Sequence, residues 1–251
     1  MTISKYGDKK VTDLSDWGRP IARIIANFLK DKPVSVIQVT NLHLVLTIYC
    51  SWLILQGSMV TACALLVVKG VIDAVDGELA RIRDKPSHVG RYWDTIADSI
   101  GLFAVMCSFA VVLQWTPYLT GLIILAILFQ YSLFNYYSIA MRSLSLGDTT
   151  SRLDERTKPT AYPWEKQSTV NFFHRIYLLS FSWQDRIIAK LSGKGSESLM
   201  FEFTLSSLLG FGFQSLILLI LALTKQLDNL PELVLLFNSA VMGAVLLRSR
   251  I

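Results

Sequence analysis

Four aspartates occur as two closely spaced pairs within apolar sequence. Asp73 and Asp76 are three residues apart in "DAVDGELAR", and Asp94 and Asp98 are four apart in "GRYWDTIADS". On a helix, either spacing places both carboxylates on one face. Charges are costly inside a membrane helix, so carboxylates in apolar sequence indicate a functional site. Four facing carboxylates would repel one another, and one or two hard divalent cations, Mg²⁺ or Mn²⁺, are the expected remedy.

Small and polar residues accompany these aspartates. Gly77 and Ala80 continue the first acidic stripe, and Gly90 begins the second. Small side chains let two helices approach closely and leave room for a phosphate-bearing ligand. Arg81 and Ser87 stand nearby; a guanidinium can clamp phosphate oxygens, and paired metal ions can neutralise a pyrophosphate. The combination suits phosphoryl transfer.

The spacing of these residues resembles the signature of the CDP-alcohol phosphotransferase family. The turn between the two halves is short enough to make the helices antiparallel neighbours. The motif spans residues 73–98, and a six-helix arrangement extends the likeness to most of the chain. Every fixed position of the signature is matched, in the order Asp73-x-x-Asp76-Gly77-x-x-Ala80-Arg81, eight residues, Gly90-x-x-x-Asp94-x-x-x-Asp98.

The resemblance implies a two-metal centre. Asp73, Asp76 and Asp94 would hold the metals, and Asp98 would contribute as a ligand while also serving as the general base. The acceptor hydroxyl, deprotonated by Asp98, would attack the β-phosphorus of the donor in line, and CMP would leave.

The resemblance also implies a substrate-binding set. Gly77, Ala80, Arg81 and Ser87 would line the CDP pocket. Family members often carry Pro-Asn before the first span, where this chain has Thr40-Asn41, so Asn41 alone is added to the set. Thr40 is equally well explained as a helix N-cap.

Other basic residues and the histidines have competing interpretations. Lys69 lies one turn before Asp73, and pairing with a carboxylate is favoured over contact with a ligand phosphate. Arg142 could bind a phosphate of the acceptor, or its side chain could extend to the membrane interface. The three histidines show no ligand spacing and are not assigned to the site: His43, His88 and His174.

Two alternatives to an enzyme remain at the level of sequence. The aspartates could be buried charges neutralised by Lys69, Arg81 and Arg91, with no metal and no reaction. The acidic cluster could also belong to a non-enzymatic divalent-cation transporter. The motif spacing and Arg81 favour the enzyme.

The elements that must position the aspartates are membrane helices. Hydrophobic residues make up 52% of the 251 residues, and the mean hydropathy is +0.45, more apolar surface than a soluble domain of this size needs to bury. The predicted fold class is all-α, an integral membrane bundle of six transmembrane helices in which 41–251 form the catalytic domain. The expected spans are 41–58, 59–82, 89–114, 117–141, 199–223 and 229–247.

The basic residues predict how these spans are oriented. Seven of the 24 precede the first span, four lie in 81–91, nine lie in 142–194, and only Lys225 falls on the opposite side. Because Lys and Arg concentrate in cytoplasmic segments, we expect a multi-pass protein with both termini in the cytoplasm and the active site facing it. Such basic clusters favour anionic membrane lipids over nucleic acid as partners.

Residues 1–40 are expected to form a cytoplasmic amphipathic N-terminal segment. Pro20 is tolerated only in the first helical turn, so a helix should begin near Gly18 or Arg19. It would lie in the membrane interface or pack on the ends of the bundle. One face of this helix would carry apolar residues, namely Trp17, Ile21, Ile24, Ile25, Phe28 and Leu29.

Two later segments also carry predictions. The cytoplasmic connection at about 143–198 begins as a polar loop, and its second half is expected to form a helix on the surface. Gly210 and Gly212 lie in a predicted span and are interpreted as sites of close helix packing.

The residues after Asp98 do not identify which donor and which acceptor the enzyme would use. A CDP-diacylglycerol donor with a small polar acceptor is favoured over a small CDP-alcohol donor with a diacylglycerol acceptor. The acceptor alcohol is not identified by the sequence. The resemblance further implies a homodimer.

Overall fold

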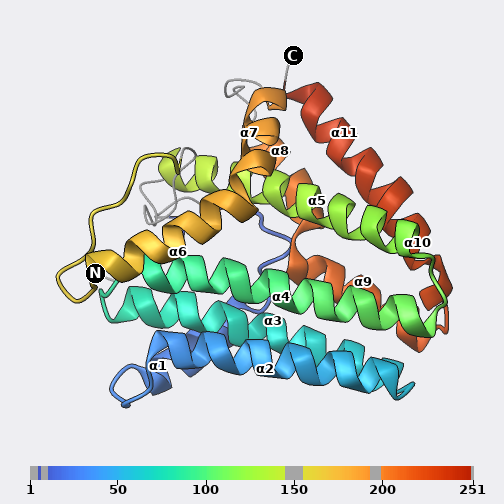
Figure 1. Ribbon diagram of the computed structural model, residues 1–251, viewed down its shortest axis with the longest axis horizontal. Helices are drawn as coiled ribbons and strands as arrows, with labels where there is room; N and C mark the ends of the chain where they lie inside the picture. The colour runs from blue at the N-terminus through green and yellow to red at the C-terminus, as the bar shows by residue number, and fades with distance from the viewer. Residues whose placement is uncertain (1–4, 7–10, 145–154, 193–198, 250–251) are drawn as a thin grey trace.

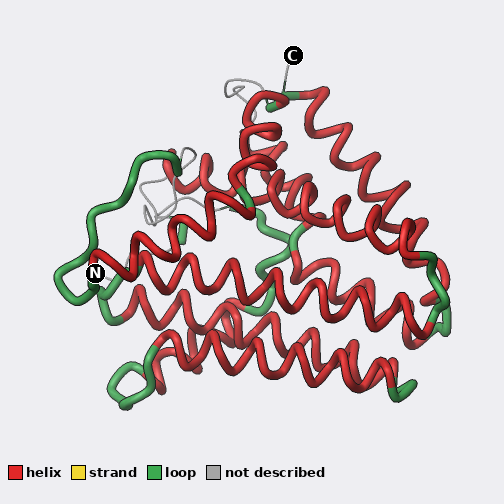
Figure 2. Tube along the Cα trace, viewed as in Figure 1, coloured by secondary structure: helices red, strands yellow, loops and turns green. Residues whose placement is uncertain are grey.

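A computed structural model of the chain describes residues 5–6, 11–144, 155–192 and 199–249. Every regular element in these ranges is helical (Figures 1 and 2), which confirms the all-α class for the described residues. The first half of the chain forms a layer of long helices joined by short turns. Its members are α2 (Val36–Leu55), α3 (Met59–Ile82), α4 (His88–Val112) and α5 (Pro117–Leu144).

Helix α2 begins earlier than predicted. Ser35 is its N-cap: the Ser35 hydroxyl accepts from the amide of Gln38 at 3.1 Å, and the Gln38 side chain accepts from the Ser35 amide at 2.7 Å. This reciprocal capping box satisfies two amides that a helix start leaves without partners. Thr40 therefore lies inside the helix, and its interpretation as an N-cap is wrong.

By length and composition, four described helices could cross a membrane. These are α2, α4, α5 and the run Leu227–Arg248, and a fifth is reached if Leu199–Leu209 and Phe211–Leu223, bent by 41°, count as one broken span. Helix α3 does not qualify, because it carries Lys69 and Asp73 among its charged residues. It has 24 residues, long enough to span a hydrocarbon core, so its crossing stays a prediction.

The second half of the chain lies across these helices. Helices α6 (Gln167–Ser180) and α7 (Ser182–Leu191) pack against α4 and α5 respectively, where a surface helix was predicted. The remaining elements are α8 (Leu199–Ser206), η1 (Ser207–Leu209), α9 (Phe211–Leu223), η2 (Leu227–Asn229), α10 (Leu230–Glu232), η3 (Leu233–Phe237) and α11 (Asn238–Arg248).

Helix α1 (Arg19–Leu29) begins where Pro20 predicts. Two fully buried alanines, Ala22 and Ala26, face α3, against which α1 packs. Its outer surface carries Ile24 and Phe28, both 71% exposed. Small residues on one face and large apolar ones on the other suit a helix between the bundle and lipid, and its interfacial position stays a prediction.

An N-terminal strap, residues 11–17, runs into the break between α8 and α9. A Cβ atom on Gly212 would lie 1.8 Å from the Ser15 carbonyl oxygen, and one on Gly210 would lie 2.5 Å from the Ser15 side chain. The indole Nε1 of Trp17 donates to the Gly212 carbonyl at 3.0 Å. The close contact at Gly212 is therefore with the strap, which corrects its interpretation as a site of helix packing. At Gly210 an added Cβ would also lie 2.9 Å from the Phe134 ring of α5, so close helix packing contributes there.

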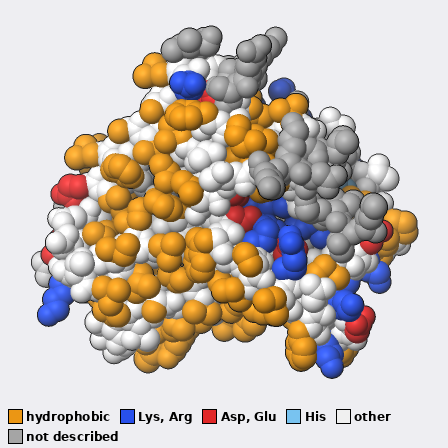
Figure 3. All heavy atoms as spheres, turned by 180° about the vertical axis from the view of Figure 1, so that it is seen from behind, with side chains coloured by type: hydrophobic (Ala, Val, Ile, Leu, Met, Phe, Trp, Pro, Cys, Tyr) orange, Lys and Arg blue, Asp and Glu red, His pale blue; other side chains and the backbone are white. Residues whose placement is uncertain are grey.

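The surface agrees with a membrane setting. Exposed large hydrophobic residues are spread along α1, α2, α4 and α5. On the face seen in Figure 3, hydrophobic side chains cover a broad area while basic side chains gather toward one side. The main apolar core lies between α2, α3, α4, α5 and α9.

Candidate metal centre and substrate cavity

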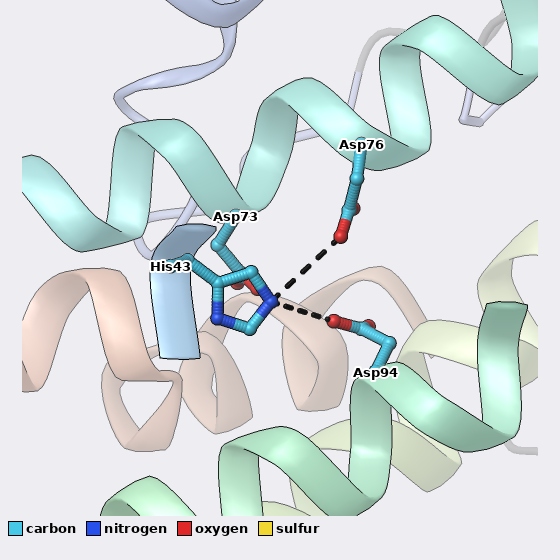
Figure 4. Close-up of side chains that lie close together, drawn as sticks. All are labelled: His43, Asp73, Asp76 and Asp94. Atoms are coloured by element: carbon cyan, nitrogen blue, oxygen red, sulfur yellow. Dashed lines mark hydrogen bonds and ion pairs between the residues drawn. The ribbon is translucent and has the colours of Figure 1, made fainter. Parts of the chain in front are cut away.

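Helices α2, α3 and α4 direct four ligand-type side chains toward one point (Figure 4). The Nε2 atom of His43 lies 3.2 Å from Asp94 Oδ1, 3.4 Å from Asp73 Oδ1 and 3.8 Å from Asp76 Oδ2. One ligand atom from each of the four residues lies within 4.8 Å of all the others. The two acidic stripes thus face each other as predicted, and α2 adds a histidine.

A polar stripe on α2 supports this group. The Thr40 hydroxyl donates to Asp76 Oδ2 at 2.8 Å, and the Thr47 hydroxyl donates to the His43 carbonyl at 2.7 Å. A Cβ on Gly101 would lie 2.8 Å from Thr47 Cγ2, so a glycine at this position allows α4 to approach α2 closely. His43 itself is 1% exposed.

Asp98 is bound by a lysine and lies outside the group of four. The Lys69 ammonium lies 2.5 Å from Asp98 Oδ1 and 3.5 Å from Asp73 Oδ1, which confirms the predicted pairing of Lys69 with carboxylates. Lys69 is buried and also lies over the Phe211 ring, 4.4 Å from its centroid. The predicted roles of Asp98 as ligand and base stay predictions.

The donor set fits a divalent cation. Three carboxylates and one imidazole are ligands that divalent metal ions accept. Asp73 Oδ1 is buried and accepts no hydrogen bond, so this oxygen has capacity for a metal ion. Without a cation, three carboxylates this close together would repel strongly, and His43 and Lys69 provide the compensation seen among the described residues. The group accounts for one metal, and a second stays a prediction.

A cavity of about 430 Å³ opens beside the acidic group. Asp73, Asp94 and Asp98 line one part of it, and the strap contributes Asp16. Its remaining walls come from α1 to α7, α9, α10 and η3, and they carry apolar side chains, for example Leu218, together with polar ones, for example Gln130. The aspartates therefore line one part of a chamber whose other walls are partly apolar and partly polar.

Arg19 connects the strap to α3 near this cavity. Its guanidinium bonds with the carboxylates of Asp16 and Glu78, and Lys5 lies 3.4 Å from Asp16. Burial alone would raise the pKa of Asp16, but Lys5 and Arg19 beside it hold that pKa below its usual range. The network therefore keeps the strap attached through ionised groups.

The residues predicted to line the CDP pocket lie farther along α3 and at the start of α4. Arg81 pairs with Glu78 at 3.0 Å, and its guanidinium lies 3.2 Å from where a Gly77 Cβ would be. Ser87 caps α4 by accepting from the Gly90 amide at 2.8 Å and donates to Glu165 at 2.7 Å. The predicted set does not line the cavity found among the described residues. Its members are Gly77, Ala80, Arg81 and Ser87.

The two remaining predicted residues are also placed away from the cavity lining. Trp93, the residue before Asp94 in the chain, donates a hydrogen bond from its indole N–H to the Asn41 side chain at 2.8 Å. Arg142 lies in the last turn of α5 and donates to the Ser138 carbonyl at 3.3 Å. The substrate-binding roles of Asn41 and Arg142 stay predictions.

His43 is the residue at this site that the sequence analysis did not assign. The signal that could have found it is a row of polar residues inside an otherwise apolar span. Positions 40, 43, 47 and 51 recur every three or four residues and so share one helix face. All four side chains are buried: Thr40, His43, Thr47 and Ser51.

Comparison with known proteins agrees with this geometry. A family model described as CDP-alcohol phosphatidyltransferase matches residues 35–208 of the 251. The match includes all three helices that supply the acidic group and its histidine. No curated protein matches the chain.

Proposed function

The chain belongs to the CDP-alcohol phosphatidyltransferase family, and from this premise we propose that it transfers a phosphatidyl group from CDP-diacylglycerol to a polar alcohol, releasing CMP. The family implies transfer of a substituted phosphate from a CDP-linked alcohol to a second alcohol. The observation that supports the proposal most is that Asp73, Asp94 and Asp98 line one cavity beside a metal-type ligand group.

The proposed metal ligands are Asp73, Asp76 and Asp94, and Asp98, four residues after Asp94 on α4, is proposed to contribute. Magnesium or manganese, when bound, would neutralise charge on the pyrophosphate of the donor and on the departing CMP. Thr40 fixes the Asp76 carboxylate by its hydrogen bond. Gly77, Ala80, Arg81 and Ser87 are proposed to contact the CDP moiety at the end of α3.

Asp98 is proposed as the general base for the acceptor hydroxyl. Its side chain is 40% exposed, the most accessible of the four aspartates, and it lines the cavity. A base must lie within hydrogen-bond reach of the proton that it removes, and an acceptor in the cavity could meet this requirement. Lys69 fixes the carboxylate in place, and the acceptor would have to enter beside it.

The apolar walls of the cavity favour a lipid donor. Leu66, Val105, Ile127 and Leu218 line its apolar part at the level of the main core, while polar side chains such as Gln130 line other parts. Acyl chains gain free energy by occupying apolar surroundings. A substrate with a diacylglycerol unit suits the apolar part of this chamber, and we propose that the donor carries this unit.

The proposed setting is a multi-pass membrane protein with the site facing the cytoplasm. The connection between α3 and α4 carries Arg83 and Lys85, while the connection between α2 and α3 carries no charge. This bias supports an orientation with α3 ending in the cytoplasm. Arg142, at the end of α5, and Asn41 are proposed acceptor and donor contacts, and the protein is proposed to act as a homodimer.

The proposal is tested by turnover in a defined membrane. The purified chain in lipid nanodiscs receives Mg²⁺ or Mn²⁺, labelled CDP-diacylglycerol and a panel of alcohols, and both CMP and lipid product are measured. Asp73→Asn and Asp98→Asn should abolish release of CMP, whereas Asp228→Asn, an exposed aspartate in η2, should retain it. Metal flux without CMP release in any combination would instead indicate a transporter and defeat the proposal.

A further inference from the structure

His43 has no counterpart in the acidic motif, yet it occupies the centre of the ligand group. Its Nε2 atom faces one oxygen from each of three carboxylates at 3.2, 3.4 and 3.8 Å. The side chain is 1% exposed and comes from α2, while the carboxylates come from α3 and α4. A buried imidazole with its nitrogen directed at three acidic oxygens either donates a hydrogen bond to one of them, that of Asp94, or shares a cation with all three.

These spacings resemble the edges of a metal coordination shell. Two ligands at about 2.1 Å from an ion and at right angles lie about 3 Å apart. The distances from His43 Nε2 to its three neighbours, 3.2, 3.4 and 3.8 Å, are about 0.2 to 0.8 Å longer than this, so side-chain shifts of under about 1 Å would bring these atoms to such spacings. Coordination through Nε2 requires a neutral imidazole with its proton on Nδ1.

On the basis of the proposed function, we propose that His43 is a metal ligand and that it biases this centre toward Mn²⁺ over Mg²⁺. Oxygen-only sites suit Mg²⁺, which binds carboxylates and water, whereas an imidazole nitrogen favours transition metals. The preference arises because transition-metal ions gain more from a nitrogen donor than the hard Mg²⁺ ion does. The four aspartates alone leave the choice between these two metals open.

The buried position of His43 strengthens the effect. Water has little access to a side chain that is 1% exposed, so a bound ion could not readily exchange the imidazole for a water ligand. The backbone carbonyl of His43 accepts from the Thr47 hydroxyl, and Thr47 in turn packs against Gly101 of α4. The contact of Thr47 with Gly101 places α2, and with it the backbone of His43, close against α4.

The experiment measures ligation directly, without turnover. The full chain in nanodiscs is loaded with Mn²⁺ alone, and pulsed electron paramagnetic resonance detects coupling between Mn²⁺ and a ligand ¹⁴N nucleus. Mg²⁺ competition against bound Mn²⁺ then gives the ratio of the two affinities. The variant is His43→Gln, which places an amide oxygen near the position of Nε2; the matched control is His174→Gln, a buried histidine of α6 whose Nε2 bonds to the Glu155 carbonyl.

We expect nitrogen coupling in the wild type and in His174→Gln, and its loss in His43→Gln. The affinity for Mn²⁺ should fall about 10-fold or more in His43→Gln, since even indirect partners of metal ligands commonly contribute that much. The affinity for Mg²⁺ should fall less, because the amide oxygen of glutamine is a ligand type that Mg²⁺ accepts, so the preference for Mn²⁺ is reduced. Mn²⁺ bound without nitrogen coupling in the wild type would overturn the inference and leave the proposed function standing. Failure of the wild type to bind any divalent ion would overturn both.

A second variant covers the case in which His43→Gln does not fold. The chain has three histidines, so the double variant His88→Gln/His174→Gln leaves His43 as the sole imidazole. Coupling that persists in the double variant assigns the nitrogen ligand to His43. Coupling that disappears there while Mn²⁺ remains bound would assign it to another histidine and overturn the inference.

Discussion

Lys69 competes with a metal ion for the same carboxylates, which gives an unusual prediction at the scale of the residue. It contacts Asp73 and Asp98 from a buried position. Lys69→Met should therefore tighten Mn²⁺ binding, because a positive charge near the metal is removed. It should also slow CMP release about 10-fold or more, because Asp98 loses the group that fixes it. Mn²⁺ titration and CMP release, measured on one preparation, test the predicted rise in affinity and the predicted fall in rate. A fall in both Mn²⁺ affinity and rate would contradict competition between Lys69 and the metal.

Thr40 offers a second prediction at this scale. Its hydroxyl donates to the buried carboxylate of Asp76 at 2.8 Å, and a hydrogen bond to a charged group contributes about 1.5–3 kcal/mol. Thr40→Val keeps the shape and removes the donor, so metal affinity should fall by roughly 10-fold or more. Thr40→Ser restores a hydroxyl and should recover most of the loss. Equal affinities in the valine and serine variants would show that the contact does not orient the ligand.

The aspartates could be predicted from sequence because helical spacing alone determines which of them share a face. Asp73 with Asp76, and Asp94 with Asp98, required no knowledge of distant contacts. His43 could not be placed in the same way, because its role depends on the rotation of α2 against α3 and α4. That rotation is set by tertiary packing, for example between Thr47 and Gly101. The spacing of the polar residues on α2 indicates a shared face but not which helices this face meets.

At the scale of the element, the strap and the break between α8 and α9 depend on each other. Gly212→Ala would place a Cβ 1.8 Å from the Ser15 carbonyl, and overpacking of this kind costs about 1–3 kcal/mol. The strap should be displaced, and proteolysis within residues 11–17 should accelerate. Gly243→Ala is the matched control, because no atom lies within 4 Å of its added Cβ. Equal protease resistance in the two variants would mean that the strap does not depend on the glycine.

The sequence predicted most elements correctly, and its errors have physical causes. Pro20 located the start of α1, and the apolar runs located the long helices. The start of α2 was misplaced because Ser35 and Gln38 form their capping box outside the apolar stretch. The strap was not predicted, because its backbone packs against glycines some 200 residues later in the chain. Such a long-range contact leaves no local pattern in the sequence.

At the scale of the whole molecule, the site requires α3 to cross the membrane despite its charges. Its 24 residues measure about 36 Å, and its lysine and aspartates face neighbouring helices rather than lipid.

If α3 crosses, the turn after α2 and the turn after α3 lie on opposite sides of the membrane. Gln56→Cys and Lys85→Cys, both at exposed turn positions, should therefore react with a membrane-impermeant thiol reagent from opposite sides, with Lys85→Cys labelled from the cytoplasm. Both variants are made in a chain carrying Cys107→Ser, because Cys107 is exposed near the end of α4, whereas Cys50 and Cys63 are buried and stay in place. Labelling of both variants from one side would place α3 outside the bilayer and remove the basis for a cytoplasmic site within the bundle.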